Sequence, residues 1–334
     1  MLKPLFTLLS PAGSRARLQV LVCHRVPREP DPLFPDAMHA QQFHRVCGWL
    51  KAWCTVLPLD DAVHRLAAGT LPARALAISF DDGYADNHEV ALPILQHHGL
   101  PACFFIATGA LDGGRMWNDS IVETLRRTRR EEIDLGGLGA GLGIDPVTAL
   151  DRLAGRHATG TAARRRSLID RLLPAVKYLP PAARSAAVAR IADRAGIAPD
   201  DLPRDLMMSS AQVRDLRRAG MQIGAHTVAH PILAALPAAE ARREIADSQR
   251  FLQELLAEPV RLFAYPNGKP GRDFSDESVE IVRDLGFIAA LSTAPGAAGP
   301  GSDLFRIPRY TPWDPSRLRF GGRLLGNLRG RAAA

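Results

Sequence analysis

Two adjacent aspartates form the first group with chemical potential in this 334-residue chain. Asp81 and Asp82 follow the apolar run ALAISF (75–80) and precede a glycine. An Asp-Gly pair is ordinary turn chemistry, so a solvated turn is one interpretation. The other is a catalytic pair, in which one carboxylate holds a metal ion while its neighbour acts as a general base. Adjacent residues at a strand end point in different directions, which suits two such roles.

Two histidines four residues apart form the second group. His226 and His230 lie in the segment GAHTVAH, and on one helical turn or a tight loop this spacing aims both imidazoles the same way. Alone, such a pair mostly packs or caps a helix. Together with one carboxylate it makes a common catalytic zinc set, which leaves a position open for water. The metal lowers the pKa of that water toward about 7, so hydroxide becomes available under mild conditions.

Short apolar runs precede most of these polar residues and predict strands. Helical patterns separate the runs, and one of them, SDESVEIVRDLG, has a serine cap and a closing glycine. Strands that alternate with helices favour parallel pairing, and the residues after parallel strands gather at one rim of a barrel. His24, Asp81, His226 and Tyr265 are therefore expected at the same rim. The predicted strands are 18–23, 75–80, 102–107, 221–225, 261–264 and 287–291.

Composition narrows the class of protein. The hydrophobic content of 46% fills a sizeable core, and the net charge of +7 comes mostly from arginine. No basic run is interleaved with aromatic residues, so no nucleic-acid partner is expected. The four cysteines form no CxxC pair, which argues against a disulfide framework or a thiolate zinc site. Without a convincing signal peptide or a run of transmembrane length, the expected location is cytoplasmic.

Three segments are expected along the chain. Residues 1–17 form an N-terminal extension, and residues 18–315 form the barrel. A helical insertion without strand patterns, at about 119–205, interrupts the barrel. Residues 316–334 form a basic tail that is expected to be solvated, with a weak membrane-surface contact, and thus a peripheral location, as the alternative.

The motifs ISFDDG, HTVAH and FAYPNG together resemble the polysaccharide deacetylase family, also known as the NodB homology or carbohydrate esterase 4 family. The resemblance covers roughly 18–118 and 206–310. It implies an α/β fold, a deformed (β/α)7 barrel, and removal of acetyl groups from N-acetylated sugars. It also implies that Asp81 is the catalytic base and that one divalent metal ion, with zinc favoured, is held by Asp82, His226 and His230.

The chain departs from the common family pattern at the general acid. Where many members carry Leu-x-His near the C-terminus, this chain reads ALST, with Thr293 in place of the histidine. The segment LVCHRVP instead resembles the start of the circularly permuted branch that acts on poly-N-acetylglucosamine. That branch takes its acid from the N-terminal strand, which makes His24 the candidate acid here. A core or capping histidine is the alternative.

A second departure concerns the arginine that orients the base. The family often has an arginine before Tyr-Pro, whereas this chain has Phe263 two residues before Tyr265. Arg306 or Arg309 is expected to supply the missing charge, with a plain surface arginine as the alternative. The backbone N–H of Tyr265 is expected to donate to the oxyanion that develops during attack on the carbonyl.

Further residues are expected to bind substrate, with weaker support. Trp117 would stack on a sugar ring and Asp119 would lie near the groove, although Asp119 could equally cap a helix. Among the other histidines, His97 and His98 end a helix and are expected to be structural or solvated, and His44 has no predicted partner. The remaining predicted substrate-binding residues are Pro266, Asn267, Arg306 and Arg309.

These roles predict a metal-dependent N-deacetylase for an N-acetylhexosamine within a glycan or a lipid-linked sugar. A related amidohydrolase or an O-deacetylase on another acyl compound would use the same site. A non-catalytic glycan- or membrane-binding barrel is a third interpretation, which the complete metal and base set disfavours.

Overall fold

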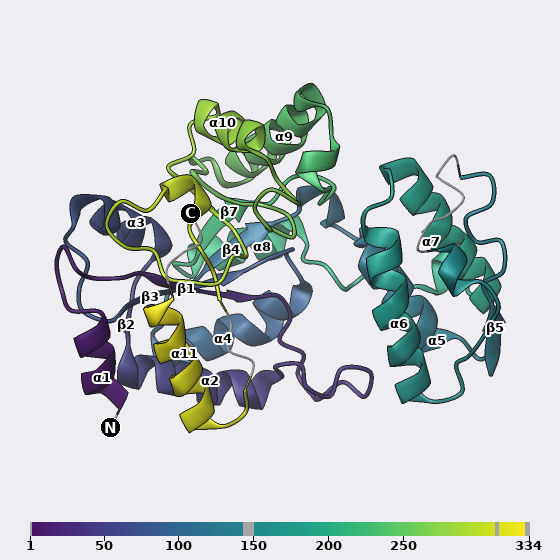
Figure 1. Cartoon of the computed structure of the whole chain (residues 1–334), viewed down its shortest axis with the longest axis horizontal. Helices are drawn as coiled ribbons and strands as arrows, with labels where there is room; N and C mark the ends of the chain where they lie inside the picture. The colour runs from purple at the N-terminus through teal and green to yellow at the C-terminus, as the bar shows by residue number, and fades with distance from the viewer. Residues whose placement is uncertain (1, 143–149, 311–313, 331–334) are drawn as a thin grey trace. The chain divides into compact units, whose positions relative to one another are not determined.

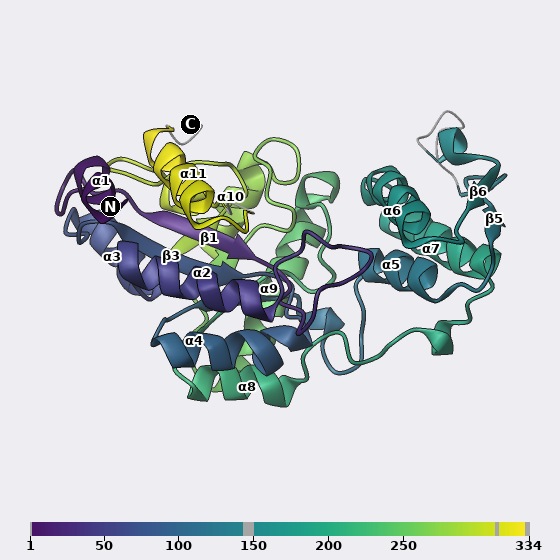
Figure 2. The same cartoon turned by 90° about the horizontal axis from the view of Figure 1, so that it is seen from below.

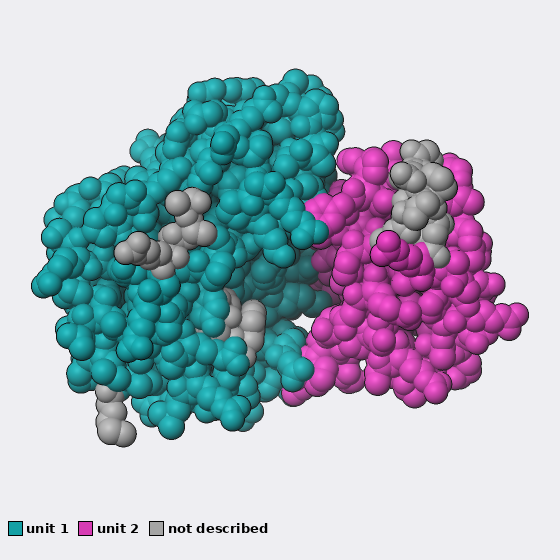
Figure 3. Space-filling model, in the orientation of Figure 1, with its two compact units in different colours: residues 1–29, 36–112, 207–334 teal, residues 30–35, 113–206 magenta. Residues whose placement is uncertain are grey.

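The computed structural model describes residues 2–142, 150–310 and 314–330. Its contacts divide the chain into two compact units (Figure 3). The first unit comprises residues 1–29, 36–112 and 207–334, and the second comprises residues 30–35 and 113–206. Each unit has a hydrophobic core of its own.

A parallel sheet of seven strands forms the centre of the first unit (Figure 1). Every strand run predicted from the sequence is confirmed, with shifts of one or two residues at the ends. One strand of this sheet, β2 (Thr55–Val56), was not predicted, because two residues are too few to show a pattern. The sheet order is β1 (Gln19–Cys23), β3 (Ala75–Phe80), β4 (Cys103–Ile106), β7 (Gln222–Ala225), β8 (Leu262–Ala264) and β9 (Ala289–Leu291), with β2 on β3.

An irregular segment after β9 connects the two edges of this sheet. Leu18 and Ala298 exchange two backbone hydrogen bonds next to β1, and the N–H of Tyr310 donates to the carbonyl of Val20 at 2.9 Å. On the other side, the N–H of Ile307 donates to Ala290 of β9 at 3.0 Å. The backbone groups of both edge strands are thereby partly satisfied, and residues near 309 are brought against the sheet.

Helices cover the sheet of the first unit. Figure 2 shows α2 and α4 along the same face, where they contact each other. Helix α10 begins as predicted, because the Ser275 hydroxyl accepts the N–H of Ser278 at 3.3 Å. The helices of this unit are α1 (Leu2–Leu9), α2 (Ala40–Trp53), α3 (Leu59–Ala68), α4 (Leu92–His98), α8 (Ser210–Arg218), α9 (Ala238–Leu256), α10 (Asp276–Asp284) and α11 (Arg317–Arg329).

The two ends of the described chain pack into the first unit. The prediction of a solvated C-terminal tail is wrong, because α11 buries Phe320, Leu324 and Leu328 in the main core. Their spacing of four residues makes an apolar stripe within an arginine-rich segment. Helix α1 contacts α11 and buries Phe6. The last four residues of the predicted tail, 331–334, lie outside the described residues.

The second unit consists of α5 (Trp117–Arg127), α6 (Ala162–Lys177) and α7 (Pro181–Ala195) around an apolar core. It also contains strands: β5 (Glu132–Asp134) pairs antiparallel with β6 (Arg156–Ala158). The expectation of a purely helical insertion is therefore wrong, because three-residue strands leave no periodic pattern to read. Within the described residues of both units, none of the helices is long and apolar enough to cross a membrane.

Candidate metal centre

Parallel strands carry the candidate residues to one end of the sheet. Asp81 and Asp82 directly follow β3, His226 directly follows β7, and His24 directly follows β1. Strands β1 and β3 pair in register, with Cys23 opposite Phe80, so the residues after them are neighbours across the ladder. The predicted gathering of these residues at one rim is confirmed.

Three ligand atoms converge at this rim. The Nε2 atoms of His226 and His230 lie 3.5 Å and 3.4 Å from Oδ1 of Asp82. Tetrahedral zinc with bonds of about 2.0–2.2 Å separates its ligand atoms by about 3.3–3.6 Å. The three side chains are almost entirely buried, and they are one of the groups of possible metal ligands among the described residues. Their spacing therefore fits a divalent metal ion.

Hydrogen bonding around the three side chains also fits a metal ion. Nδ1 of His226 lies 2.7 Å from the carbonyl oxygen of Ala264, to which it must donate its proton, so Nε2 keeps its lone pair. Oδ1 of Asp82 is buried and has no hydrogen-bond partner among the described residues. A buried carboxylate oxygen without a donor is costly, and a cation between it and the two imidazoles removes that cost.

The electrostatic environment prepares these side chains to bind a cation. Burial raises the pKa of Asp82, but the neighbouring imidazoles of His226, His230 and His24 outweigh it and hold this pKa well below its usual range. Burial lowers the pKa of His230 to about 4, so this imidazole stays neutral. An ionised carboxylate and a neutral imidazole are the forms that bind metal.

The backbone at the site is held in an uncommon conformation. Asp82, Thr227 and His230 have φ angles of 77°, 65° and 51°, in the left-handed region that L-residues seldom adopt. HTVAH is therefore a tight loop rather than a helical turn, and the Thr227 hydroxyl accepts the N–H of His230 at 3.1 Å. Oε2 of Glu244 accepts the N–H groups of Val228 and Ala229, at 2.9 Å and 2.8 Å. Such conformations persist where surrounding bonds hold them, often at functional sites.

The guanidinium of Arg309 clamps Asp81. Its two terminal nitrogens donate to the two carboxylate oxygens at 2.6 Å and 2.7 Å, and its Nε donates to the carbonyl of Ser292 at 3.0 Å. Burial raises the pKa of Asp81, but Arg309 and the nearby histidines together lower it by more than burial raises it. The net shift of this pKa is therefore downward. The expectation that Arg306 or Arg309 supplies the missing charge is confirmed for Arg309.

The two arginines differ in whether a substrate could reach them. The prediction that Arg309 binds substrate is wrong, because its side chain is 0% exposed and is used by Asp81. Arg306 instead pairs with Asp276 and Asp303 at the surface. Substrate binding by Arg306 stays a prediction.

Tyr265 is a structural residue in this fold. Its backbone N–H donates to Leu291 at 3.1 Å, within the ladder between β8 and β9, so the prediction that this N–H serves an oxyanion is wrong. Its hydroxyl donates to the carbonyl of Phe305 at 3.0 Å, and its ring stacks on Phe274 at 3.8 Å. Burial raises the pKa of the phenol, which keeps it a donor.

The loop after Tyr265 is fastened by Thr293, the residue that stands in place of the usual histidine. The Thr293 hydroxyl donates to the carbonyl of Asn267 at 2.6 Å, and its N–H donates to Gly268 at 2.8 Å. Asn267 has a φ of 60°, and Pro266 is buried beside it. Substrate binding by Pro266 and Asn267 stays a prediction.

His24 is exposed at the same rim. Its carbonyl oxygen accepts from Nδ2 of Asn87 at 2.7 Å, which fixes the backbone where β1 ends. His24 is one of the nearby groups that lower the pKa values of Asp81 and Asp82, although burial and other partners have larger effects on both. A solvent-facing imidazole next to both carboxylates is available to a substrate, and its role as the acid stays a prediction.

The second unit holds the remaining predicted substrate residues. Trp117 and Asp119 lie in the first turn of α5, where Asp119 is buried and Trp117 packs against the core of that unit. The guanidinium of Arg184 lies 5.4 Å from the centre of the Trp117 ring. Both residues thus have packing roles within the unit, and their contact with substrate stays a prediction.

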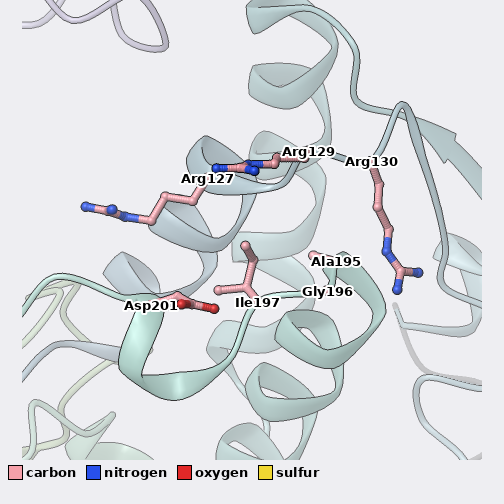
Figure 4. A pocket seen from close by; sticks show the side chains of 7 residues that line it. All are labelled: Arg127, Arg129, Arg130, Ala195, Gly196, Ile197 and Asp201. Carbon is pink, nitrogen blue, oxygen red and sulfur yellow. The ribbon is translucent and has the colours of Figure 1, made fainter.

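A pocket of about 690 Å³ lies in the second unit, and its lining residues do not include a set of metal ligands like that of Asp82, His226 and His230. Figure 4 shows that Arg127 and Arg130 extend away from each other at its edge. Arg127 is already 3.6 Å from the carboxylate of Glu123. The pocket is lined by Arg127, Arg129, Arg130, Ala195, Gly196, Ile197 and Asp201.

Comparison with known proteins identifies the family. The sequence profile of the polysaccharide deacetylase family matches residues 68–137 and 184–290, just over half of the chain. The chain belongs to this family, as its motifs predict. One curated relative, named "Putative polysaccharide deacetylase YxkH", from Bacillus subtilis (strain 168), is 22% identical over 102 residues. That match covers 30% of this chain and only 35% of the relative.

Solved structures share the fold over nearly the whole chain. The Streptococcus pyogenes deacetylase PplD in complex with acetate is 16% identical, with a TM-score of 0.58 over 94% of this chain and 98% of that one. IcaB from Ammonifex degensii is 18% identical, with a TM-score of 0.58 over 96% of this chain and 99% of that one. A de-N-acetylase from Aggregatibacter actinomycetemcomitans is 18% identical, with a TM-score of 0.53 over 88% of this chain and 94% of that one. The predicted deformed barrel is confirmed.

Proposed function

We propose that this protein is a metal-dependent hydrolase that removes the acetyl group from an N-acetylhexosamine in a glycan or a lipid-linked sugar. The observation that carries the proposal is the pairing of two adjacent carboxylates with different partners. Asp82 lies against two histidines with the spacing of a metal site, and Asp81 is held by Arg309. The de-N-acetylase with the same fold supports an amide rather than an ester as the bond cleaved.

The chain's own residues have separate roles in this reaction. Asp82, His226 and His230 would hold the metal, with zinc favoured by two imidazoles and a carboxylate. A divalent ion there acts as a Lewis acid, which acidifies water and polarises a carbonyl. Asp81 accepts the proton of the attacking water, and Arg309 keeps both of its oxygens oriented. His24 donates a proton to the nitrogen of the leaving sugar amine, because an amide anion is too poor a leaving group.

The amide substrate can be tested against its alternative. Purified enzyme reconstituted with zinc would be incubated with oligomers of β-1,6-linked N-acetylglucosamine, chitooligosaccharides and an O-acetylated sugar, and the released acetate would be measured. We expect release from an N-acetylated oligomer. Release from the O-acetylated sugar alone would favour the O-deacetylase interpretation, and no release from any of them, with metal bound, would favour a non-catalytic barrel.

The substitution Asp81→Asn tests the proposed base. The amide keeps the size of the carboxylate but cannot accept the proton, so turnover should fall by about 10² or more while metal content is unchanged. The change also leaves the buried Arg309 without its counter-charge, which costs about 3–5 kcal/mol of stability. Rates must therefore be compared at a temperature where calorimetry shows both proteins folded. Loss of metal in Asp81→Asn, with metal retained in Asp82→Asn, would mean that the two roles are reversed.

We further propose that the surface of α1 and α11 rests on anionic membrane lipid, near which a lipid-linked substrate would be presented. Three large apolar side chains are exposed there: Leu5 at 47%, Leu8 at 77% and Leu318 at 69%. Arg317 and Arg319 flank Leu318, which suits negative headgroups. The protein should co-sediment with phosphatidylglycerol vesicles, and a Leu5→Ser/Leu8→Ser/Leu318→Ser variant should not. The matched control is Phe251→Ser on α9; equal binding by all three proteins would contradict the proposal.

A further inference from the structure

Three histidines come together away from the candidate metal centre. His44 lies on α2, and His97 and His98 end α4, so the group joins two helices that are far apart in sequence. One ring nitrogen from each can be chosen so that all three lie within 4.8 Å of one another. The expectation that His44 has no partner is wrong, because the contact between α2 and α4 brings it to the end of α4.

The spacing of these rings matches that of the candidate metal ligands. The ring centres are 5.1 Å apart for His44 and His97, 4.6 Å for His44 and His98, and 5.0 Å for His97 and His98. In the candidate metal centre, the rings of His226 and His230 are 4.9 Å apart. Each pair in the group is thus about as close as the two imidazoles of the candidate metal centre.

One nitrogen of the group lacks a partner. Nε2 of His98 is buried and has no hydrogen-bond partner among the described residues. A buried ring nitrogen without a hydrogen-bond partner is costly, and a metal ion bound to it would remove that cost.

The helices position the group for a cation. Gly48 lies one turn after His44 on α2, and a Cβ there would be in ordinary van der Waals contact with Cε1 of His98, at 3.6 Å, so the two helices pack closely at the group. His97 and His98 form the last turn of α4, where the negative end of the helix dipole favours positive charge. Against this, Lys51 donates to the carbonyl of His98 at 2.6 Å and brings one opposing charge.

We propose that His44, His97 and His98 form a second metal site, which binds a divalent transition ion of the zinc class. Three imidazoles without a carboxylate or thiolate suit Zn²⁺, Cu²⁺ or Ni²⁺ rather than Mg²⁺ or Ca²⁺. Because its ligands come from two helices, the bound ion clips α2 to α4 and stabilises the folded first unit. The site is independent of the proposed deacetylase activity.

Counting bound zinc in matched variants tests this site. Each protein would be stripped with chelator, dialysed against about 10 µM free Zn²⁺ and analysed for metal by mass spectrometry; affinities of protein zinc sites are tighter than this. The parent should bind about two ions per chain, and His44→Gln/His97→Gln about one. Asp82→Ala/His226→Ala should also bind about one, and the four-fold variant none. The control His64→Gln, an exposed histidine on α3, should bind as the parent does.

A stability measurement separates a specific site from loose surface binding. In the Asp82→Ala/His226→Ala background, zinc should raise the melting temperature by several degrees, and the added change His44→Gln/His97→Gln should abolish that rise. Equal zinc content with and without the three-histidine group would overturn the proposal. Binding by this group that appears only at millimolar zinc, or without any rise in melting temperature, would overturn it as well.

Discussion

His226→Ala is expected to lose the catalytic metal ion and nearly all deacetylase activity. This side chain is one of the three proposed protein ligands, and its Nδ1 hydrogen bond to Ala264 holds it in place. With two ligands left, the affinity for a metal ion should collapse, and the Lewis acid that the proposed hydrolysis requires would be lost. Asp82→Ala and His230→Ala should behave alike, since all three ligand atoms lie within 4.8 Å of one another.

Metal analysis and acetate release on the same samples check this prediction. Metal content should fall by about one ion per chain relative to the parent. The measurement is cleanest in the His44→Gln/His97→Gln background, where the second proposed site cannot contribute. The fold should persist, because the large apolar cores of the first unit do not include these side chains. If all three variants bound zinc as tightly as the parent, the ligand assignment would be wrong.

His24→Ala is expected to keep the metal ion and the fold while the rate falls by about 10²–10⁴. Hydrolysis of an amide needs a proton on the departing nitrogen, and Thr293 cannot act as an acid near neutral pH. Thr293 is moreover committed to the loop through its bond to Asn267. His24 stands at the rim beside Asp81, and its imidazole is exposed, so its removal should cost little stability.

The pH dependence of the rate distinguishes an acid from a binding residue. An acid works only in its protonated form, so the parent should lose activity toward alkaline pH. In His24→Ala that alkaline decline should vanish, and added imidazole should restore part of the rate. His64→Ala provides the control for loss of an exposed histidine. Full activity of His24→Ala would leave the acid to another group and remove the support for the permuted-branch resemblance.

Local pattern was enough to predict most of the sheet and the residues that gather at the candidate metal centre. Each strand run ends at a polar residue, and parallel pairing places such residues at one rim whatever the details of packing. Asp81, Asp82, His226 and His230 were therefore identifiable from residue type and spacing. The short strands β2, β5 and β6 were not, because two or three residues carry no period.

Tertiary structure alone decided the partners of these residues. Arg309 lies 228 positions from Asp81, and only the irregular segment after β9 brings it there and buries it. The same packing directs the N–H of Tyr265 into the sheet and α11 into the core, against expectation. His44 likewise meets His97 and His98 through the contact of two helices. Burial and hydrogen-bond partners arise from segments distant in the chain, so residue type and spacing predict which groups can react, while packing determines what each one touches.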